Sequence, residues 1–359
     1  MRTWAEINVD NFIYNMKKIQ EKSAGRKVIA VVKADCYGMG AVKLSHELKE
    51  KCGVDFFAVA ALSEAVELRE SGIKDKILIL GGVFDEELKE VEKYGFHIAL
   101  TSLRQLKIIH ENSLNIECHL KLETGMGRVG FSKNELAELK KYVKENNIKN
   151  ITGVYTHLSV SDEEGEDNRK YTEKQIEKFN SFEGIDTIEY RHVLNSGGIL
   201  NYAGMDNAGY VRAGIIQYGV CSGKYIEGFK PVFTFKSKIL FLKKLDEDSD
   251  ISYGRTAHLK KGTVLATIAA GYADGFKREI SNRGTVTIHG VECFVRGKVC
   301  MDMFMAEIPE EIQNKVSEGD EVILYGENIG KQAQLMNISI YELFTGIGKR
   351  AERIYTGNK

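Results

Sequence analysis

Eight short apolar runs, separated by charged segments of helical length, fill the first 220 residues of this 359-residue chain. Strand-like runs that alternate with helix-like segments indicate βα units and a parallel sheet. A count of eight favours an α/β fold with a closed (β/α)8 TIM-like barrel, and an open doubly wound sheet is the alternative. The expected strands are 28–32, 56–61, 77–80, 97–100, 116–122, 151–156, 190–194 and 215–221. The expected helices include 41–52, 63–71, 85–94, 102–111, 133–147 and 168–182.

The pattern changes after Pro231, where apolar runs follow one another across short Gly and Asp turns. Few segments of helical length intervene before 330–346. This pattern is typical of a compact, mostly antiparallel β domain. We therefore expect a barrel domain over 1–230 and a C-terminal β domain over 231–359. The expected strands of the second domain are 232–242, 263–270, 284–288, 291–299, 303–308 and 321–325.

Composition excludes several classes of protein. Lys and Arg total 50 against 51 Asp and Glu, so bulk positive charge for binding nucleic acid is absent. Hydrophobic residues make up 43% of the chain, which excludes intrinsic disorder. No apolar run approaches the ~18 residues of a membrane span, and the N-terminus MRTWAEINVDN lacks an apolar signal-peptide core. We expect a cytoplasmic protein that binds neither nucleic acid nor membrane.

The six cysteines form no C-x-x-C pair, and their spacing fits no zinc template, so no metal site is expected. We interpret them as reduced thiols of an intracellular protein.

Lys33 directly follows the first apolar run. Barrel enzymes place their chemistry at the C-terminal ends of the strands, and desolvation there frees an amine's lone pair for Schiff-base formation. The alternative is a lysine that merely extends to solvent at the strand end. Tyr37 and the glycines that follow could hold a phosphate near this amine.

Gly125, Gly127 and Gly130 form a G-x-G-x-x-G pattern, the signature of a dinucleotide site. A dinucleotide fold requires an acidic residue at the end of the next strand, but that strand ends in Tyr-Thr-His157. We therefore reject a dinucleotide site and interpret Arg128, within the glycine loop, as a donor to an anion or oxygen.

The last two βα turns are rich in glycine and predict a phosphate site. Asn195-Ser196-Gly-Gly follows the seventh run, and Arg212-Ala-Gly214-Ile215 leads into the eighth. Barrels often bind phosphate at these turns through backbone N–H groups. By this strand assignment Arg212 precedes its strand. A strand-end lysine beside a phosphate site suggests pyridoxal phosphate.

With these residues in view, the chain resembles the alanine racemase family over essentially its whole length. The stretch VVKADCYGMG at 31–40 is similar to the family's cofactor-lysine signature, with Asp35-Cys36 in place of Asn and a small residue. Further matches, in order, are TGMGRVG at 124–130, THLSVSD at 156–162, NSGG at 195–198, VRAGI at 211–215, SYGRT at 252–256, GYADGFKR at 271–278, KVCMD at 298–302 and the tail from Tyr341 to Arg353.

The resemblance implies a homodimer that interconverts L- and D-alanine on pyridoxal phosphate by a two-base mechanism and supplies D-alanine for peptidoglycan. Lys33 would carry the cofactor and serve as one base, and Tyr253 from the partner subunit would be the other. The implied cofactor-binding residues are Lys33, Tyr37, Arg128, His157, Ser196, Arg212, Gly214, Ile215 and Tyr341. The implied substrate-binding residues are Arg128 and the partner's Met301, and those of the entrance corridor are Asp162, Tyr272 and Arg278. Lys121 matches a lysine that is carbamylated in many members. The first strand, about 1–9, belongs with the β domain in such proteins.

The chain departs from the family pattern at Lys298, where an arginine is usual, and in the tail, where 350–353 read RAER without the usual Val-Pro. Both departures bear on the entrance and not on the two bases. A serine or broad-specificity racemase, a barrel-type amino-acid decarboxylase and a cofactor-binding protein with a degenerate site are the alternatives. The SYGRT and CMD motifs favour a racemase over a decarboxylase, and retention of Lys33 and Tyr253 opposes a degenerate site.

Overall fold

The computed structural model describes residues 1–357 and divides into two compact units. One unit is Ile13–Gln217, and the other joins Met1–Phe12 to Tyr218–Lys359. The division thus falls before residue 218, whereas the sequence predicts a boundary after 230. Residues 218–230 include a hairpin of two short strands, β10 (Val220–Cys221) and β11 (Lys224–Tyr225).

The first unit is a closed barrel of eight parallel strands, which confirms the predicted fold class. Closure comes from β2 and β9, which pair in parallel with Lys27 opposite Tyr210. Most strand residues are buried, as expected where helices cover a parallel sheet. The strands are β2 (Lys27–Val31), β3 (Phe56–Val59), β4 (Lys76–Ile79), β5 (His97–Leu100), β6 (Glu117–Lys121), β7 (Ile151–Tyr155), β8 (Tyr190–His192) and β9 (Tyr210–Ala213).

The eighth strand was predicted at 215–221, and this assignment is wrong. The strand that closes the barrel is β9, and Ile215–Tyr218 forms a short 3-10 helix. The apolar run 215–221 is buried throughout, so its hydrophobicity reports burial and not strand structure. As a result, Arg212 lies within the strand and not before it.

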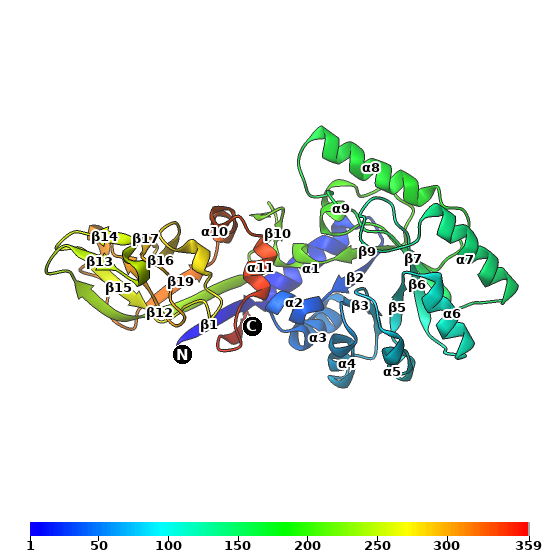
Figure 1. Cartoon of the computed structure of the whole chain (residues 1–359), viewed down its shortest axis with the longest axis horizontal. Coiled ribbons are helices and arrows are strands. Elements are labelled where there is room, and N and C mark those ends of the chain that lie inside the picture. The colour runs from blue at the N-terminus through cyan, green and yellow to red at the C-terminus, as the bar shows by residue number, and fades with distance from the viewer. Residues whose placement is uncertain (358–359) are drawn as a thin grey trace. The chain divides into compact units, whose positions relative to one another are not determined.

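Helices connect the strands and lie at the periphery of the barrel unit (Figure 1). Helix α7 shows why they begin where they do, since Ser132 and Glu135 form a reciprocal capping box. The helices are α1 (Val9–Lys22), α2 (Lys33–Gly38), α3 (Ala41–Cys52), α4 (Leu62–Glu70), α5 (Leu88–Tyr94), α6 (Leu103–Glu111), α7 (Lys133–Glu145), α8 (Glu166–Asn180) and α9 (Ser196–Asn201). Within residues 1–357, no helix combines the length and the apolar character that crossing a bilayer requires.

The second unit is built on one eight-stranded sheet in the order β15-β18-β17-β16-β19-β12-β1-β20, with an additional β12–β15 pairing. The N-terminal strand β1 lies antiparallel to β12, with Ala5 opposite Phe235, and parallel to β20. Its strands are β1 (Thr3–Asn8), β12 (Phe233–Lys244), β15 (Val264–Ile268), β16 (Thr285–Ile288), β17 (Val291–Arg296), β18 (Phe304–Glu307), β19 (Glu321–Tyr325) and β20 (Glu352–Thr356). A hairpin of β13 (Ser249–Ile251) and β14 (Ala257–Leu259) and the helices α10 (Ile329–Met336) and α11 (Ile340–Thr345) complete it.

Aromatic and imidazole rings fill part of the barrel interior, and a glycine makes room for them. The Phe56 ring lies 5.8 Å from that of His119, and the Tyr190 ring stacks on His119 at 5.5 Å. A Cβ on Gly153, in β7, would clash with the His119 ring. The His119 ring therefore explains why a glycine, Gly153, interrupts the otherwise apolar run ITGVY.

Gly153→Ala is expected to destabilise the protein by about 2 kcal/mol, because overpacking a well-packed interior costs roughly 1–3 kcal/mol. Gly209→Ala is the matched control, since a Cβ at Gly209 meets nothing within 4 Å. Urea denaturation monitored by circular dichroism measures both variants. Equal midpoints for the two variants would show that the barrel accommodates the added methyl group.

Candidate active site

Lys33 is separated from the end of β2 by one residue and stands at the start of a short turn of unusual backbone. Ala34, Asp35, Cys36 and Tyr37 all have positive φ between 51° and 57°. Two hydrogen bonds hold this segment: the Ala34 N–H donates to Glu64 Oε1 (2.5 Å), and the Ala41 N–H donates to Asp35 Oδ1 (2.7 Å). Consecutive non-glycine residues in this region store strain, which proteins retain mainly at functional sites.

The Lys33 amine has a lowered pKa. Its side chain is accessible at the mouth of the barrel although protein atoms surround much of it, and it makes no hydrogen bond or ion pair within the described residues. Desolvation lowers the pKa of this amine, the positive charge of Arg128 lowers it further, and Glu64 opposes both. A lowered pKa increases the neutral, nucleophilic fraction of the amine near pH 7.

Two hydroxyl groups meet at a glycine turn after β9. A Cβ on Gly214 would lie 2.5 Å from the Tyr37 hydroxyl and 3.5 Å from Ser196 Oγ, so glycine keeps this space open. Ser196 Oγ accepts hydrogen bonds from the N–H groups of Gly214 (3.2 Å) and Ile216 (3.4 Å). Ile215 lies between them and is buried. Hydroxyl groups and backbone amides at a glycine turn suit a phosphate group.

Arg212 is buried within β9 and aims its guanidinium at backbone carbonyls and imidazole nitrogens. Its Nη1 donates to His192 O (2.8 Å) and His192 Nδ1 (2.9 Å). Its Nη2 donates to the carbonyls of Thr156 (2.7 Å) and Val193 (3.0 Å). No carboxylate among residues 1–357 pairs with it, and burial lowers its pKa to about 10.

His157 lies where the charges of four cations converge. Burial lowers its pKa to about 3, and the positive charges of Arg212, Arg128, Lys121 and Lys33 contribute to this shift. His157 is therefore neutral at physiological pH. These electrostatic couplings bring together residues from four separate βα turns or strands of the barrel.

Lys121 and Arg128 differ in their surroundings. Lys121 is buried at the end of β6, donates to Leu122 O (2.7 Å) and has a pKa lowered by burial to about 8. Arg128 is exposed and makes no hydrogen bond or ion pair with a described residue. Asp162 follows β7, and its backbone lies against the position that a Cβ on Gly197 would fill.

In the second unit, Tyr253 projects from the turn between β13 and β14 and is 73% exposed. Ser252 takes a positive φ of 64°, and its Oγ donates to Lys298 O (2.6 Å). Lys298 Nζ lies 3.1 Å from the position of a Cβ on Gly254. The lysine that replaces the usual arginine thus stands beside the tyrosine's own turn.

Met301 lies near this turn, since Ser252 Oγ is 3.6 Å from Cys300 Sγ. The Tyr272 and Ala273 N–H groups donate to the carbonyls of Cys300 and Met301, both at 3.1 Å. The Met301 N–H itself donates to no acceptor in the described part of the chain. Tyr272 and Met301 are exposed, as is Arg278.

Two more positions named from the sequence lie in this unit. Tyr341 is the second residue of α11 and is 39% exposed. In the tail, Arg350 forms ion pairs with Asp274 (3.1 Å) and Asp302 (2.8 Å). Arg353 donates to the carbonyls of Ile347, Gly348 and Ala351. The RAER sequence is therefore held by charge and backbone contacts.

Sequence reasoning missed three buried histidines, His97, His119 and His192. The signal was available, because each is a polar residue inside a run that otherwise predicts a buried strand. His192 contacts Arg212 directly.

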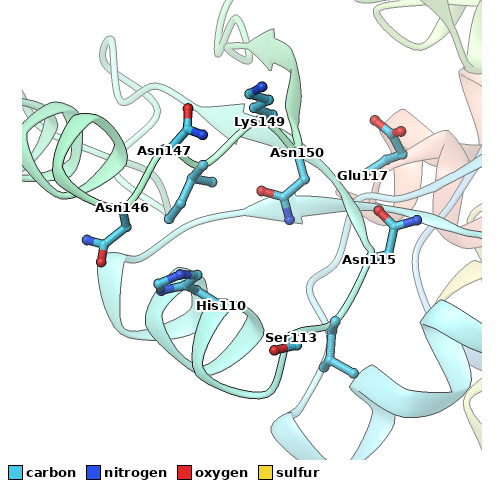
Figure 2. A pocket seen from close by; sticks show the side chains of 10 residues that line it. His110, Ser113, Asn115, Glu117, Asn146, Asn147, Lys149 and Asn150 are labelled. Atoms are coloured by element: carbon cyan, nitrogen blue, oxygen red, sulfur yellow. The ribbon is translucent and has the colours of Figure 1, made fainter.

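The side chains shown in Figure 2 line a hollow of ≈ 450 Å³, which lies at the end of the barrel away from Lys33. It is lined by residues that precede or begin β6 and β7, such as Asn115, Glu117 and Asn150. Lys33 follows the C-terminal end of a parallel strand, so this hollow belongs to the opposite rim. It is not part of the candidate active site.

A closed parallel barrel with an amine of lowered pKa beyond the C-terminal end of its first strand, followed by a β domain, indicates a barrel enzyme. The family model described as "Alanine racemase, N-terminal domain" matches residues 7–222, and the model described as "Alanine racemase, C-terminal domain" matches residues 232–355. The chain belongs to the alanine racemase family and is an isomerase.

Named relatives and solved structures are similar to this chain over nearly its full length. The alanine racemase of Fusobacterium nucleatum is 42% identical over 99% of both chains. Alanine racemase 1 of Clostridium acetobutylicum is 36% identical over 99% of this chain and 95% of its own. The crystal structure of the E. faecalis alanine racemase has a TM-score of 0.90 at 29% identity and covers 99% of this chain and 98% of its own. The crystal structure of the Bartonella henselae alanine racemase, with covalently bound pyridoxal phosphate, has a TM-score of 0.90 at 28% identity and covers 99% of this chain and 100% of its own.

Proposed function

We propose that the chain interconverts L-alanine and D-alanine on pyridoxal phosphate by a two-base mechanism. The observation that carries the proposal is the grouping of Lys33, Arg128, Lys121 and Arg212 around His157, whose Nδ1 lies 3.5 Å from Arg212 Nη2. It supports one site at the C-terminal rim of the barrel that offers two amines and two guanidinium groups.

The residues of the barrel unit fit the cofactor. Its aldehyde requires an amine, and Lys33 has one with a lowered pKa and no bonded partner among the described residues. Its phosphate requires hydrogen-bond donors, which the Tyr37 and Ser196 hydroxyl groups offer beside the open turn at Gly214. Its ring nitrogen requires a polar partner, for which we propose Arg212. The other proposed cofactor residues are Arg128, His157, Ile215 and Tyr341.

The chemistry that bound pyridoxal phosphate supplies is electron withdrawal, which makes the proton on the substrate's α-carbon removable. Lys33 Nζ takes or gives this proton on one face of the carbon. Tyr253 Oη does so on the other face, so that the configuration inverts. Arg212 has only N–H donors, so a nitrogen that faces it remains an acceptor. This arrangement limits electron withdrawal to what racemisation needs and disfavours side reactions.

The β unit supplies the second base to a partner's barrel unit in a homodimer. Tyr253 and Met301 are 73% and 53% exposed, so both are accessible to a partner's barrel unit. The free N–H of Met301 is suited to bind the substrate's carboxylate together with Arg128. Tyr272, Arg278 and the barrel's Asp162 form the entrance corridor of this proposal.

Lys121 is the proposed site of carbamylation. Burial lowers the pKa of its amine to about 8, and a neutral amine is the form that reacts with carbon dioxide. The carbamate would carry a negative charge beside Arg128 and fix its guanidinium. In the cell, we propose that the enzyme works in the cytoplasm and supplies D-alanine for peptidoglycan, in line with its bacterial relatives.

A chiral assay tests the proposed function. The purified protein with pyridoxal phosphate is incubated separately with L-alanine, L-serine and L-lysine, and the enantiomers are separated by chiral chromatography. We expect D-alanine to form much faster than D-serine or D-lysine. Comparable rates with serine would instead assign a broad-specificity racemase. Release of carbon dioxide without a D-amino acid would assign a decarboxylase.

A further inference from the structure

Three buried histidines form a chain of ring-to-ring contacts that ends on Arg212. Arg212 Nη1 lies 2.9 Å from His192 Nδ1. His192 Nε2 lies 2.9 Å from His119 Nδ1, and His119 Nε2 lies 3.1 Å from His97 Nδ1. The rings come from β8, β6 and β5, and all four residues are buried.

The donor inventory determines where every proton in this chain lies. A guanidinium has only donors, so His192 Nδ1 accepts and the ring proton of His192 is on Nε2. That N–H donates to His119 Nδ1, which places the proton of His119 on Nε2 as well. The same step places the proton of His97 on Nε2. The chain therefore has one direction, imposed by Arg212.

The three rings are neutral. Burial and the charge of Arg212 lower the pKa values of His119 and His192 well below the ordinary value. Burial, Lys76 and Arg69 lower the pKa of His97 to about 4. Each neutral ring thus has one donor and one acceptor nitrogen, as the directed chain requires.

Neighbouring side chains fix the ring planes. The Tyr155 ring stacks on His192 at 4.8 Å with an interplanar angle of 10°. The Tyr190 ring stacks on His119 at the same angle and meets His97 edge-on. Gly153 leaves space for the His119 ring. The rings cannot turn to exchange their nitrogens without disturbing this packing.

Arg212 needs this arrangement because it is a buried cation without a described carboxylate partner. Its acceptors are carbonyls and the lone pair of His192, with a longer contact of 3.5 Å to His157 Nδ1. In the directed chain, all three imidazoles point their lone-pair side toward the guanidinium. Hydrogen bonds in such a series polarise one another in a low-dielectric interior. The chain thus stabilises a guanidinium that has no direct carboxylate partner among the described residues and only the longer-range attraction of Asp206.

We propose that His192, His119 and His97 form a directed hydrogen-bond chain that holds Arg212 as an oriented cation, with His97 as a remote positioning residue. The chain is not a proton wire, because the guanidinium at its end does not accept a proton. The inference rests on the proposed function only in taking Arg212 to face the cofactor's ring nitrogen. The direction of the histidine chain and the protonation of its rings follow from the contacts among the three histidines and Arg212.

The first test determines the tautomers directly. Full-length protein with its cofactor, labelled with ¹⁵N-histidine, is examined by two-dimensional NMR that correlates ring nitrogens with ring protons. We expect His97, His119 and His192 to carry a proton on Nε2 and none on Nδ1 at pH 7. An Nδ1–H tautomer or an imidazolium at any of the three would overturn the proposal. Loss of the proposed racemase function would not alter these tautomers, so the two failures are distinguishable.

The second test breaks the far end of the chain. His97→Leu removes the acceptor for the His119 N–H, whereas His97→Asn keeps an acceptor near the position of Nδ1. We expect His97→Leu to shift the His119 and Arg212 side-chain resonances and the visible absorption maximum of the bound cofactor. Its kcat should fall by about tenfold, the lower range for loss of a partner that orients a catalytic group, with KM within about twofold. His97→Asn should restore all four values.

The exposed His110→Leu is the control for loss of an imidazole elsewhere on the barrel. Unchanged Arg212 and His119 resonances in His97→Leu would overturn the proposal. If His97→Leu does not fold, the tautomers of the unaltered protein decide the question.

Discussion

Lys33→Ala is expected to abolish racemisation, with a loss of at least about 10³-fold, because the substitution removes both the covalent attachment point and one of the two bases. The amine has a lowered pKa and no bonded partner within the described residues, and no other lysine is proposed to attach the cofactor. The variant should also lose the visible absorbance of lysine-bound cofactor. Mass spectrometry after borohydride reduction measures whether the cofactor is still attached to the chain.

The matched control is Lys27→Ala, which removes a lysine from the opposite end of the same strand, β2. It should keep both activity and attachment. A Lys33→Ala protein that still carries a borohydride-fixed cofactor on another lysine would contradict the assignment.

Tyr253→Phe is expected to retain the cofactor but to lose racemisation by at least about 10²-fold, the usual lower range for removal of a general acid–base group. The substitution removes only Oη from a side chain that is 73% exposed, so stability should not change. If the two bases serve opposite faces, exchange of the α-proton in deuterated water should fall far more for one enantiomer of alanine than for the other.

Tyr94→Phe is the control, because it removes a hydroxyl that is hydrogen-bonded to Glu70 on the barrel. It should leave exchange unchanged. Equal residual exchange from L- and D-alanine in Tyr253→Phe would favour a single base that serves both faces.

Most of the barrel could be predicted from local pattern, because parallel strands covered by helices are continuous apolar runs. Seven of the eight barrel strands lie where the runs predict them, from β2 to β8. The eighth could not be found in this way, since β9 carries the buried Arg212 in its middle and the more apolar run lies just after it. Pairing with β2 selects Tyr210–Ala213, and pairing is not visible in local hydrophobicity.

Helix α1 was overlooked although its signal was present. Its buried residues Phe12, Met16 and Ile19 follow helical spacing. The strands β13, β14 and β20 are short or only partly buried, so they lack a strong apolar run.

For the candidate site, the rule of strand ends selected Lys33 and His157 from position alone. It could not select Tyr253 or Met301, which lie on turns of the β unit and were found by resemblance. Neither the strand-end rule nor the resemblance identifies the histidine chain. Its members lie within strands, and their role depends on contacts between strands that are far apart in the sequence.

Each active site of the proposed homodimer combines Lys33 of one subunit with Tyr253 of the other. Mixing inactive Lys33→Ala chains with inactive Tyr253→Phe chains tests this arrangement most directly. A mixed dimer would contain one site with both defects and one with neither, since an isologous dimer has two equivalent sites. Subunit exchange, followed by native mass spectrometry, should therefore restore up to about half of the activity of an unaltered dimer per mixed dimer. Demonstrated exchange without any return of activity would contradict the shared site and place Tyr253 in the site of its own chain.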